Sequence, residues 1–274
     1  QLDFASGEIK TSGDYALGIQ VVDYTADGMN FTTGANVTTT GTGAEGVLLS
    51  GSAGGEDAIQ HQATINGNIS AGNATGIIMS GYGGGYTLTT GGNISAGGDF
   101  GYGIQVGTAN NTSSNIAITT AAGKAIQAAR TGIWANNAGT GAGNITITNN
   151  STINAVNHGI DANNASQGNI TIQNTGNIAS TTASAIHTLN KSVGDISITT
   201  SGTLVGKTNG IQALSAGSGN VTINSTNDIE GQGQDGINAG ANLGNVIVNT
   251  NNTKGDQHGI NAQTITGDVS VNTT

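Results

Sequence analysis

The chain has 274 residues, with 47 glycines, no proline, no cysteine, 8% charged residues and a formal net charge of −10. Its six lysines and arginines are scattered, whereas a surface that binds nucleic acid or anionic lipid needs clustered positive charge. The composition therefore argues against both partners, and the absence of cysteine excludes metal–thiolate sites. Apolar stretches are too short to span a bilayer, and a chain without thiols is compatible with secretion.

A motif returns about every 25 residues, a period typical of a stacked solenoid. It reads Gly-Asn-Ile-Thr-Ile, then a single Ile or Leu, then Gly-Ile-x-Ala. One copy runs from Gly143 to Ile147, passes Ile153 and ends at 159–162. Alternation of apolar and polar residues indicates strands, and Gly, Asn, Asp and Ser between them favour tight corners. We therefore predict three strands and three corners in each turn of the solenoid, called a coil below.

The fold class predicted is all-β: a right-handed parallel β-helix of about ten three-strand coils. Equivalent aliphatic residues of successive coils should stack in columns, with coils about 4.8 Å apart and a rod on the order of 48 Å long. The right hand follows the usual hand of parallel crossovers. The first predicted column is Phe4, Phe31, Ile65, Leu88, Ile118, Ile147, Ile172, Ile198, Ile223, Val248 and Val271. The second contains Ile153, Ile178, Leu204 and Ile229. The third is Ile19, Val47, Ile77, Ile104, Ile133, Ile160, Ile186, Ile211, Ile237 and Ile260.

We predict one domain over 1–274, less regular over 1–143 and regular over 144–274. Extra residues in the first part should form loops at 51–57 and 107–114, and binding features are expected in this part. Because neither end shows a cap that would protect a solenoid, the chain is expected to be a fragment of a longer protein.

The Gly-Asn-Ile-Thr-Ile and Gly-Ile-x-Ala coil resembles the passenger domains of large bacterial autotransporters (type V secretion). The resemblance covers the whole chain and concerns architecture and composition. It implies display on the outer surface of a Gram-negative cell, or release from it. It further implies a non-enzymatic virulence role, in which the rod binds a host cell-surface receptor, a matrix protein or a glycan, or associates with a second copy between bacteria.

Candidate contact residues come from the few aromatic side chains and from one predicted stripe. In three consecutive coils, the residue after the Ile of the third column is Trp134, Asp161 and His187, so these three should lie side by side on one outer face. Exposed aromatic side chains suit contacts to sugar or protein. The possible ligand-contact surface is Tyr82, Tyr86, Tyr102, Trp134, Asp161 and His187.

Other chemistry has weaker support. Glu56-Asp57 is the one adjacent acidic pair, and the other acids are isolated, with Asp195 and Asp268 at the Asn position of a corner. His158 and His258 share a register but lie four coils apart, so they cannot share a ligand. We therefore expect no catalytic residues, no cofactor and no metal. A carbohydrate-active β-helix enzyme is the first alternative, which a cleft with two carboxylates would favour. An ice-binding β-helix is the second, although its outward Thr ladder is irregular.

Overall fold

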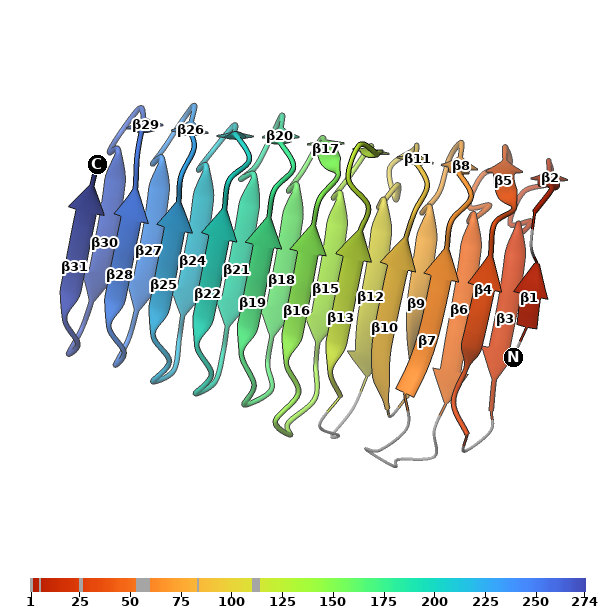
Figure 1. Cartoon of the computed structure of the whole chain (residues 1–274), viewed down its shortest axis with the longest axis horizontal. Helices are drawn as coiled ribbons and strands as arrows, with labels where there is room; N and C mark the ends of the chain where they lie inside the picture. Colours follow the sequence, from red (N-terminus) through yellow and green to blue (C-terminus); the bar gives the residue numbers. More distant parts are fainter. Residues whose placement is uncertain (1, 5, 25–26, 53–59, 83, 110–113) are drawn as a thin grey trace.

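The computed structural model describes residues 2–4, 6–24, 27–52, 60–82, 84–109 and 114–274. The described residues form strands, turns and bends, without a helix, and the strands build three parallel sheets. Successive coils lie side by side along one axis, with the first and third sheets facing each other and the short strands of the second sheet along one edge (Figure 1). The predicted all-β parallel solenoid of about ten coils is confirmed.

Each sheet takes one strand from every coil. The first sheet, with 11 described strands, consists of β1 (Leu2–Phe4), β4 (Asn30–Thr33), β7 (Gln60–Ile65), β10 (Gly85–Thr90), β13 (Ile116–Thr120), β16 (Ile145–Asn149), β19 (Ile170–Asn174), β22 (Ile196–Thr200), β25 (Val221–Ser225), β28 (Val246–Thr250) and β31 (Val269–Thr273).

The second sheet, with 10 described strands, consists of β2 (Glu8–Thr11), β5 (Asn36–Thr39), β8 (Ile69–Ala71), β11 (Ile94–Ala96), β14 (Ala125–Ala128), β17 (Thr152–Ala155), β20 (Ile178–Ser180), β23 (Leu204–Gly206), β26 (Ile229–Gly231) and β29 (Thr253–Gly255).

The third sheet, also with 10 described strands, consists of β3 (Ile19–Asp23), β6 (Val47–Ser52), β9 (Ile77–Tyr82), β12 (Ile104–Ala109), β15 (Ile133–Asn137), β18 (Ile160–Asn164), β21 (Ile186–Asn190), β24 (Ile211–Ser215), β27 (Ile237–Ala241) and β30 (Ile260–Thr264).

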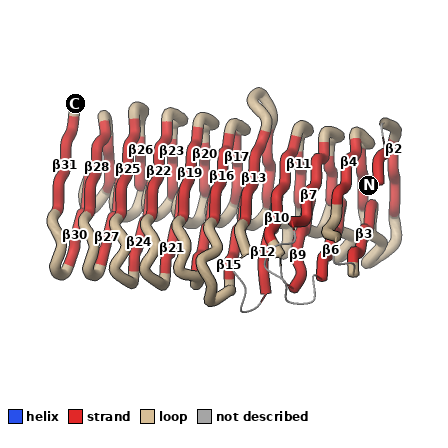
Figure 2. Tube along the Cα trace, turned by 60° about the horizontal axis from the view of Figure 1, so that its bottom comes forward, coloured by secondary structure: helices blue, strands red, loops and turns tan. Residues whose placement is uncertain are grey.

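The winding is right-handed. In Figure 1 the strands of the first sheet run upward in front, the chain crosses over the top, and the strands of the third sheet run downward behind, while the coils advance from right to left. Figure 2 shows the same succession of coils after rotation about the long axis. This hand agrees with the general preference of parallel crossover connections.

The predicted aliphatic columns are confirmed over most of the chain. Ile147 pairs with Ile172 in the neighbouring coil, and Ile172 pairs with Ile198. The third column is paired without a shift from Ile19 to Ile260. Most of these side chains are fully buried in one continuous core, since inward residues of all three sheets meet in the narrow interior.

The first column is wrong at two N-terminal positions. Phe31 pairs with Ala63, and Leu88 also pairs with Ala63, so Ile65 lies one inward position further along its strand. Phe4 is displaced in the same direction, because Leu2 pairs with Phe31. The loop boundaries are also corrected: β6 extends to Ser52 and β12 to Ala109. Of the two predicted loops, residues 53–57 and 110–113 lie outside the described residues, and Ser114 is buried.

The inward position taken by Ile65 is polar in the neighbouring coils, where the structure shows a buried hydrogen-bonded column. Thr120 Oγ1 donates to Asn149 Oδ1 (2.8 Å), and Asn149 Nδ2 donates to Asn174 Oδ1 (2.7 Å). Asn174 Nδ2 then donates to Thr200 Oγ1 (3.0 Å). Because the side chains bond to their equivalents in the next coil, this polar column satisfies itself inside the core.

Candidate ligand-contact face

The predicted stripe lies on the outer side of the third sheet. Trp134 on β15 pairs with Asp161 on β18, and Asp161 pairs with His187 on β21. Gln105 on β12 precedes Trp134 in the same row. All three stripe residues are partly exposed, since they alternate with the buried aliphatic residues of the same strands. The predicted juxtaposition of Trp134, Asp161 and His187 is therefore confirmed, whereas their contact with a ligand stays a prediction.

A groove of about 620 Å³ lies on this face at the N-terminal side of the stripe. Three aromatic side chains line it: Trp134, Tyr82 at the end of β9, and Tyr24, which follows β3. Tyr82 is 57% exposed and Tyr24 is 81% exposed. The rest of the lining is small or polar and consists of Ser50, Gly51, Ser80, Gly81, Gln105, Gly107, Thr108 and Asn136. We refer to this site as the aromatic groove.

Glycines leave space on both sides of the sheet at the aromatic groove. A Cβ atom on Gly107 would lie 3.3 Å from Cζ3 of Trp134, so the indole ring packs directly over this glycine. A Cβ on Gly81 would collide with the backbone of Gly51, and one on Gly51 would collide with the ring of His61. Gly107 therefore leaves room for the indole on the outer side, whereas Gly51 and Gly81 leave room on the inner side for the rings of His61 and Tyr86.

Tyr86 does not belong to the exposed face. It is 1% exposed, and its ring stacks on that of His61 with the ring centroids 5.2 Å apart. Its hydroxyl donates a hydrogen bond to the carbonyl of Gly51 (3.3 Å), and burial raises its pKa to about 12. The prediction of Tyr86 as a surface contact is wrong, because the first inward position of β10 takes a large ring where the opposing glycines leave space.

Tyr102 connects the stripe to the adjacent corner. Its ring lies 6.0 Å from that of Trp134, and the guanidinium of Arg130 lies over it, 4.7 Å from the centroid. Burial raises the pKa of the Tyr102 hydroxyl, the charge of Arg130 opposes this, and Asp161 adds to it. Arg130 was not among the predicted contacts, because its position in a corner gives no periodic signal.

The structure adds His158 to the stripe. Its ring stacks on that of His187, with centroids 4.9 Å apart and planes 25° apart, and His187 Nδ1 lies 2.7 Å from Asp161 Oδ1. Asn163 Nδ2 donates to the same Asp161 oxygen (2.8 Å). The pKa of His158 is lowered, chiefly because burial removes the ring from water. The charge of Asp161 and a backbone hydrogen bond with Ser184 oppose this shift, and His187 adds to it. His158 was not among the predicted contacts, because it lies two residues before β18 and at a different place in its coil from Asp161 and His187.

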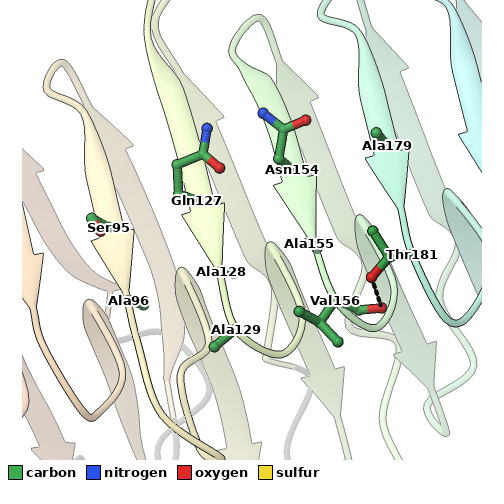
Figure 3. Close-up of a pocket in the computed structure, with 10 residues that line it drawn as sticks. All are labelled: Ser95, Ala96, Gln127, Ala128, Ala129, Asn154, Ala155, Val156, Ala179 and Thr181. Atoms are coloured by element: carbon green, nitrogen blue, oxygen red, sulfur yellow. Dashed lines mark hydrogen bonds between the residues drawn. The ribbon is translucent and has the colours of Figure 1, made fainter.

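Two further depressions differ from the aromatic groove in chemistry. One, of about 280 Å³, lies on the second sheet and has a lining of mostly small side chains without an aromatic or ionisable group. In Figure 3, Gln127 and Asn154 project in the same direction beside it. The other, of about 370 Å³, lies at the corner before the third sheet, where Glu45 and Asp99 line it together with Tyr15 and Phe100.

Fold and site together define a class: a parallel β-solenoid that presents an aromatic groove and a cluster of His and Asp on one outer face. Comparison of the chain with protein-family models, with curated proteins and with solved structures gives no match. In the part of the chain that the structure describes, no helix has the length and apolarity needed to cross a membrane.

Proposed function

We propose that this chain is the rod-shaped passenger of a bacterial autotransporter, which acts outside the cell as a non-enzymatic adhesive protein. The single observation that carries the proposal is the aromatic groove, in which two largely exposed tyrosines and a partly exposed tryptophan lie on the outer face of a solenoid. Large exposed aromatic side chains on a rigid sheet suit recognition, because they supply contact area at a small cost in conformational entropy. The regular coils after Gly143 would hold this face away from the cell.

The chemistry of the groove favours a glycan over a charged ligand. Its lining offers aromatic faces, hydroxyls, side-chain amides and exposed backbone, and it contains no ionisable group other than the two tyrosines. Hydroxyl-rich ligands need such convergent donors and acceptors, while the rings cover their apolar faces. A protein receptor, a matrix protein and a second copy of the chain are the other partners that the experiment below distinguishes.

Binding of the purified chain to a glycan array and to cultured host cells tests this function. The triple variant Tyr24→Ala, Tyr82→Ala and Trp134→Ala should lose most of the binding, since hot-spot aromatic residues cost about 2 kcal/mol or more each when truncated. The matched control is Tyr15→Ala with Phe100→Ala, which removes two exposed aromatic side chains that lie outside the aromatic groove. Equal binding by the triple variant and the wild type would refute the proposed contact face.

A carbohydrate-active enzyme remains a second candidate because of the depression that Glu45 and Asp99 line. Glu45 precedes the third strand of its coil, and Asp99 lies near the equivalent corner two coils later. Two strand spacings give a separation on the order of 10 Å, close to that of the paired carboxyls of inverting glycosidases. Release of reducing ends from polysaccharides by the wild type, and its loss in Glu45→Gln or Asp99→Asn, would favour this reading over adhesion.

A further inference from the structure

The three side chains of His158, Asp161 and His187 converge at one point of the solenoid surface. His158 directly precedes Gly159 at the entrance to β18, Asp161 is the second residue of β18, and His187 is the second residue of β21. One potential ligand atom from each residue lies within 4.8 Å of those of the other two. Within the described part of the chain, this is the one group of three His, Asp or Glu residues found with such a spacing.

Strand register and one side-chain hydrogen bond hold these side chains close together without a bound ion. Ile160 pairs with Ile186 in register, so Asp161 and His187 are direct neighbours across two strands. Asn163 Nδ2 donates to Asp161 Oδ1 and holds the carboxylate, as groups behind metal ligands commonly do. His158 Nδ1 is buried and has no hydrogen-bond partner among the described residues. The fold therefore leaves one nitrogen of this ring unused.

We propose that His158, Asp161 and His187 form a zinc site. Two imidazoles and one carboxylate suit Zn²⁺ better than Ca²⁺ or Mg²⁺, because those two ions favour all-oxygen ligands. Tetrahedral coordination at about 2.0–2.2 Å requires ligand atoms somewhat closer together than 4.8 Å, and side-chain rotation on the two strands supplies this movement. The side chains of His187 and Asp161 are 20% and 15% exposed, so an ion can enter from solvent and keep a fourth position open.

The pair of His258 and Asp235 is an internal control for this proposal. His258 Nδ1 lies 2.7 Å from Asp235 Oδ1, the same contact that joins His187 and Asp161. Asn261 Nδ2 donates to Asp235 there (3.2 Å), as Asn163 does to Asp161, but no second His completes a triad at this place among the described residues. A His–Asp pair alone should bind zinc far more weakly than the complete set.

Isothermal titration of the whole chain, purified without a polyhistidine tag, with ZnCl₂ tests the site. We expect one Zn²⁺ per chain. The variants His158→Gln, Asp161→Asn and His187→Gln should each weaken binding by more than about tenfold, and Asn163→Ala by about tenfold. His258→Gln should bind like the wild type. Absence of binding by the wild type, or undiminished binding by both His158→Gln and His187→Gln, would overturn the proposal.

A second measurement needs no variant and therefore does not depend on whether a substituted chain folds. In imidazole ¹H–¹⁵N spectra of the wild type, substoichiometric Zn²⁺ should shift the ring signals of His158 and His187 and leave those of His61 and His258 in place. Equal shifts at His258 would show that the ion binds exposed histidines without selection, which contradicts a built site.

Discussion

Asparagine and aspartate at the corner before the first sheet connect successive coils from Asn115 onward. The side-chain oxygen of Asn144 accepts a hydrogen bond from the backbone amide of Asn169 (2.8 Å), and Asn169 accepts one from Asp195 (2.8 Å). The contact continues from Asp195 to Asn220 (2.7 Å), and further on from Asn245 to Asp268 (2.8 Å). The Asp195 carboxylate thus accepts the bond that an Asn side chain accepts elsewhere, and the Asp268 amide donates at the equivalent place, which confirms both as corner residues.

The buried Asn column should be more sensitive to truncation than the outer surface. Asn174→Ala removes both the acceptor for Asn149 and the donor to Thr200, so it should lower the free energy of unfolding by about 2 kcal/mol. Gln173→Ala, an outward substitution on the same strand, should stay within about 0.5 kcal/mol. Urea denaturation of both variants measures the difference, and equal effects would show that the column contributes no net stabilisation.

Stability should fall as the solution is acidified, in part because of His61. Burial lowers the pKa of His61 from 6.5, an effect that Asp23 opposes, and its Nδ1 accepts a hydrogen bond from the amide of Met29. The folded state therefore holds the ring neutral. The stability contributed by the neutral ring is fully present above pH 6.5, the pKa of an unperturbed His. As the pH falls from 6.5 toward the lowered pKa of the folded state, the unfolded chain takes up a proton that the folded chain does not. The free energy of unfolding therefore decreases by at most about 1.4 kcal/mol per pH unit.

The variant His61→Gln isolates this contribution, since a Gln side chain can accept the same backbone hydrogen bond without titrating. Thermal unfolding at pH 7 and pH 5 should show a smaller decrease for His61→Gln than for the wild type. A decrease of the same size in both chains would contradict the assignment of the acid sensitivity to His61.

At the scale of the strand, the aliphatic columns supply most of the core. Ile172 is fully buried between Ile147 and Ile198. Ile172→Ala should therefore cost about 2–5 kcal/mol, through lost transfer free energy and the cavity that remains. Ile265→Ala, at an exposed corner position, is the matched control and should change stability by less than about 0.5 kcal/mol. Comparable losses for the two variants would mean that the column does not form.

The sequence predicted the strand positions well where two aliphatic residues mark each first-sheet strand, as in Ile145 and Ile147. It failed in register at β1 and β7, because a first-sheet strand offers up to three inward positions and a large apolar residue does not reveal which one it occupies. Phe31 lies at the level of Ala63, and Ile65 takes the next inward position, opposite Thr33. Ala63, the partner of Phe31, is too small to mark the column.

The sequence also predicted one part of the candidate site and missed another. The neighbourhood of Trp134, Asp161 and His187 follows from the repeat alone, because all three occupy the same place in consecutive coils. The inward turn of Tyr86 and the approach of His158 to His187 depend instead on side-chain packing across coils. The repeat does not encode such contacts, since they involve residues at different places in their coils.

At the scale of the molecule, the exposed aromatic side chains of the described residues lie in the N-terminal half of the rod. Tyr15, Tyr24, Tyr82 and Phe100 all precede the regular coils, and Trp134 lies just before them. The remaining outer surface is dominated by small, hydroxyl and amide side chains, with few charges. This uneven distribution agrees with a division between a contact region and a spacer, as we propose for an adhesive passenger.

Trp134 is the one tryptophan in the chain, so its fluorescence reports on the aromatic groove without interference from another indole. The most direct test of the account is a titration of the wild-type chain with a glycan retained on the array, followed by the emission of Trp134. If the aromatic groove binds the glycan, the emission should change saturably and Trp134→Ala should lose affinity. Saturable binding measured by calorimetry, with unchanged emission and equal affinity in Trp134→Ala, would contradict it.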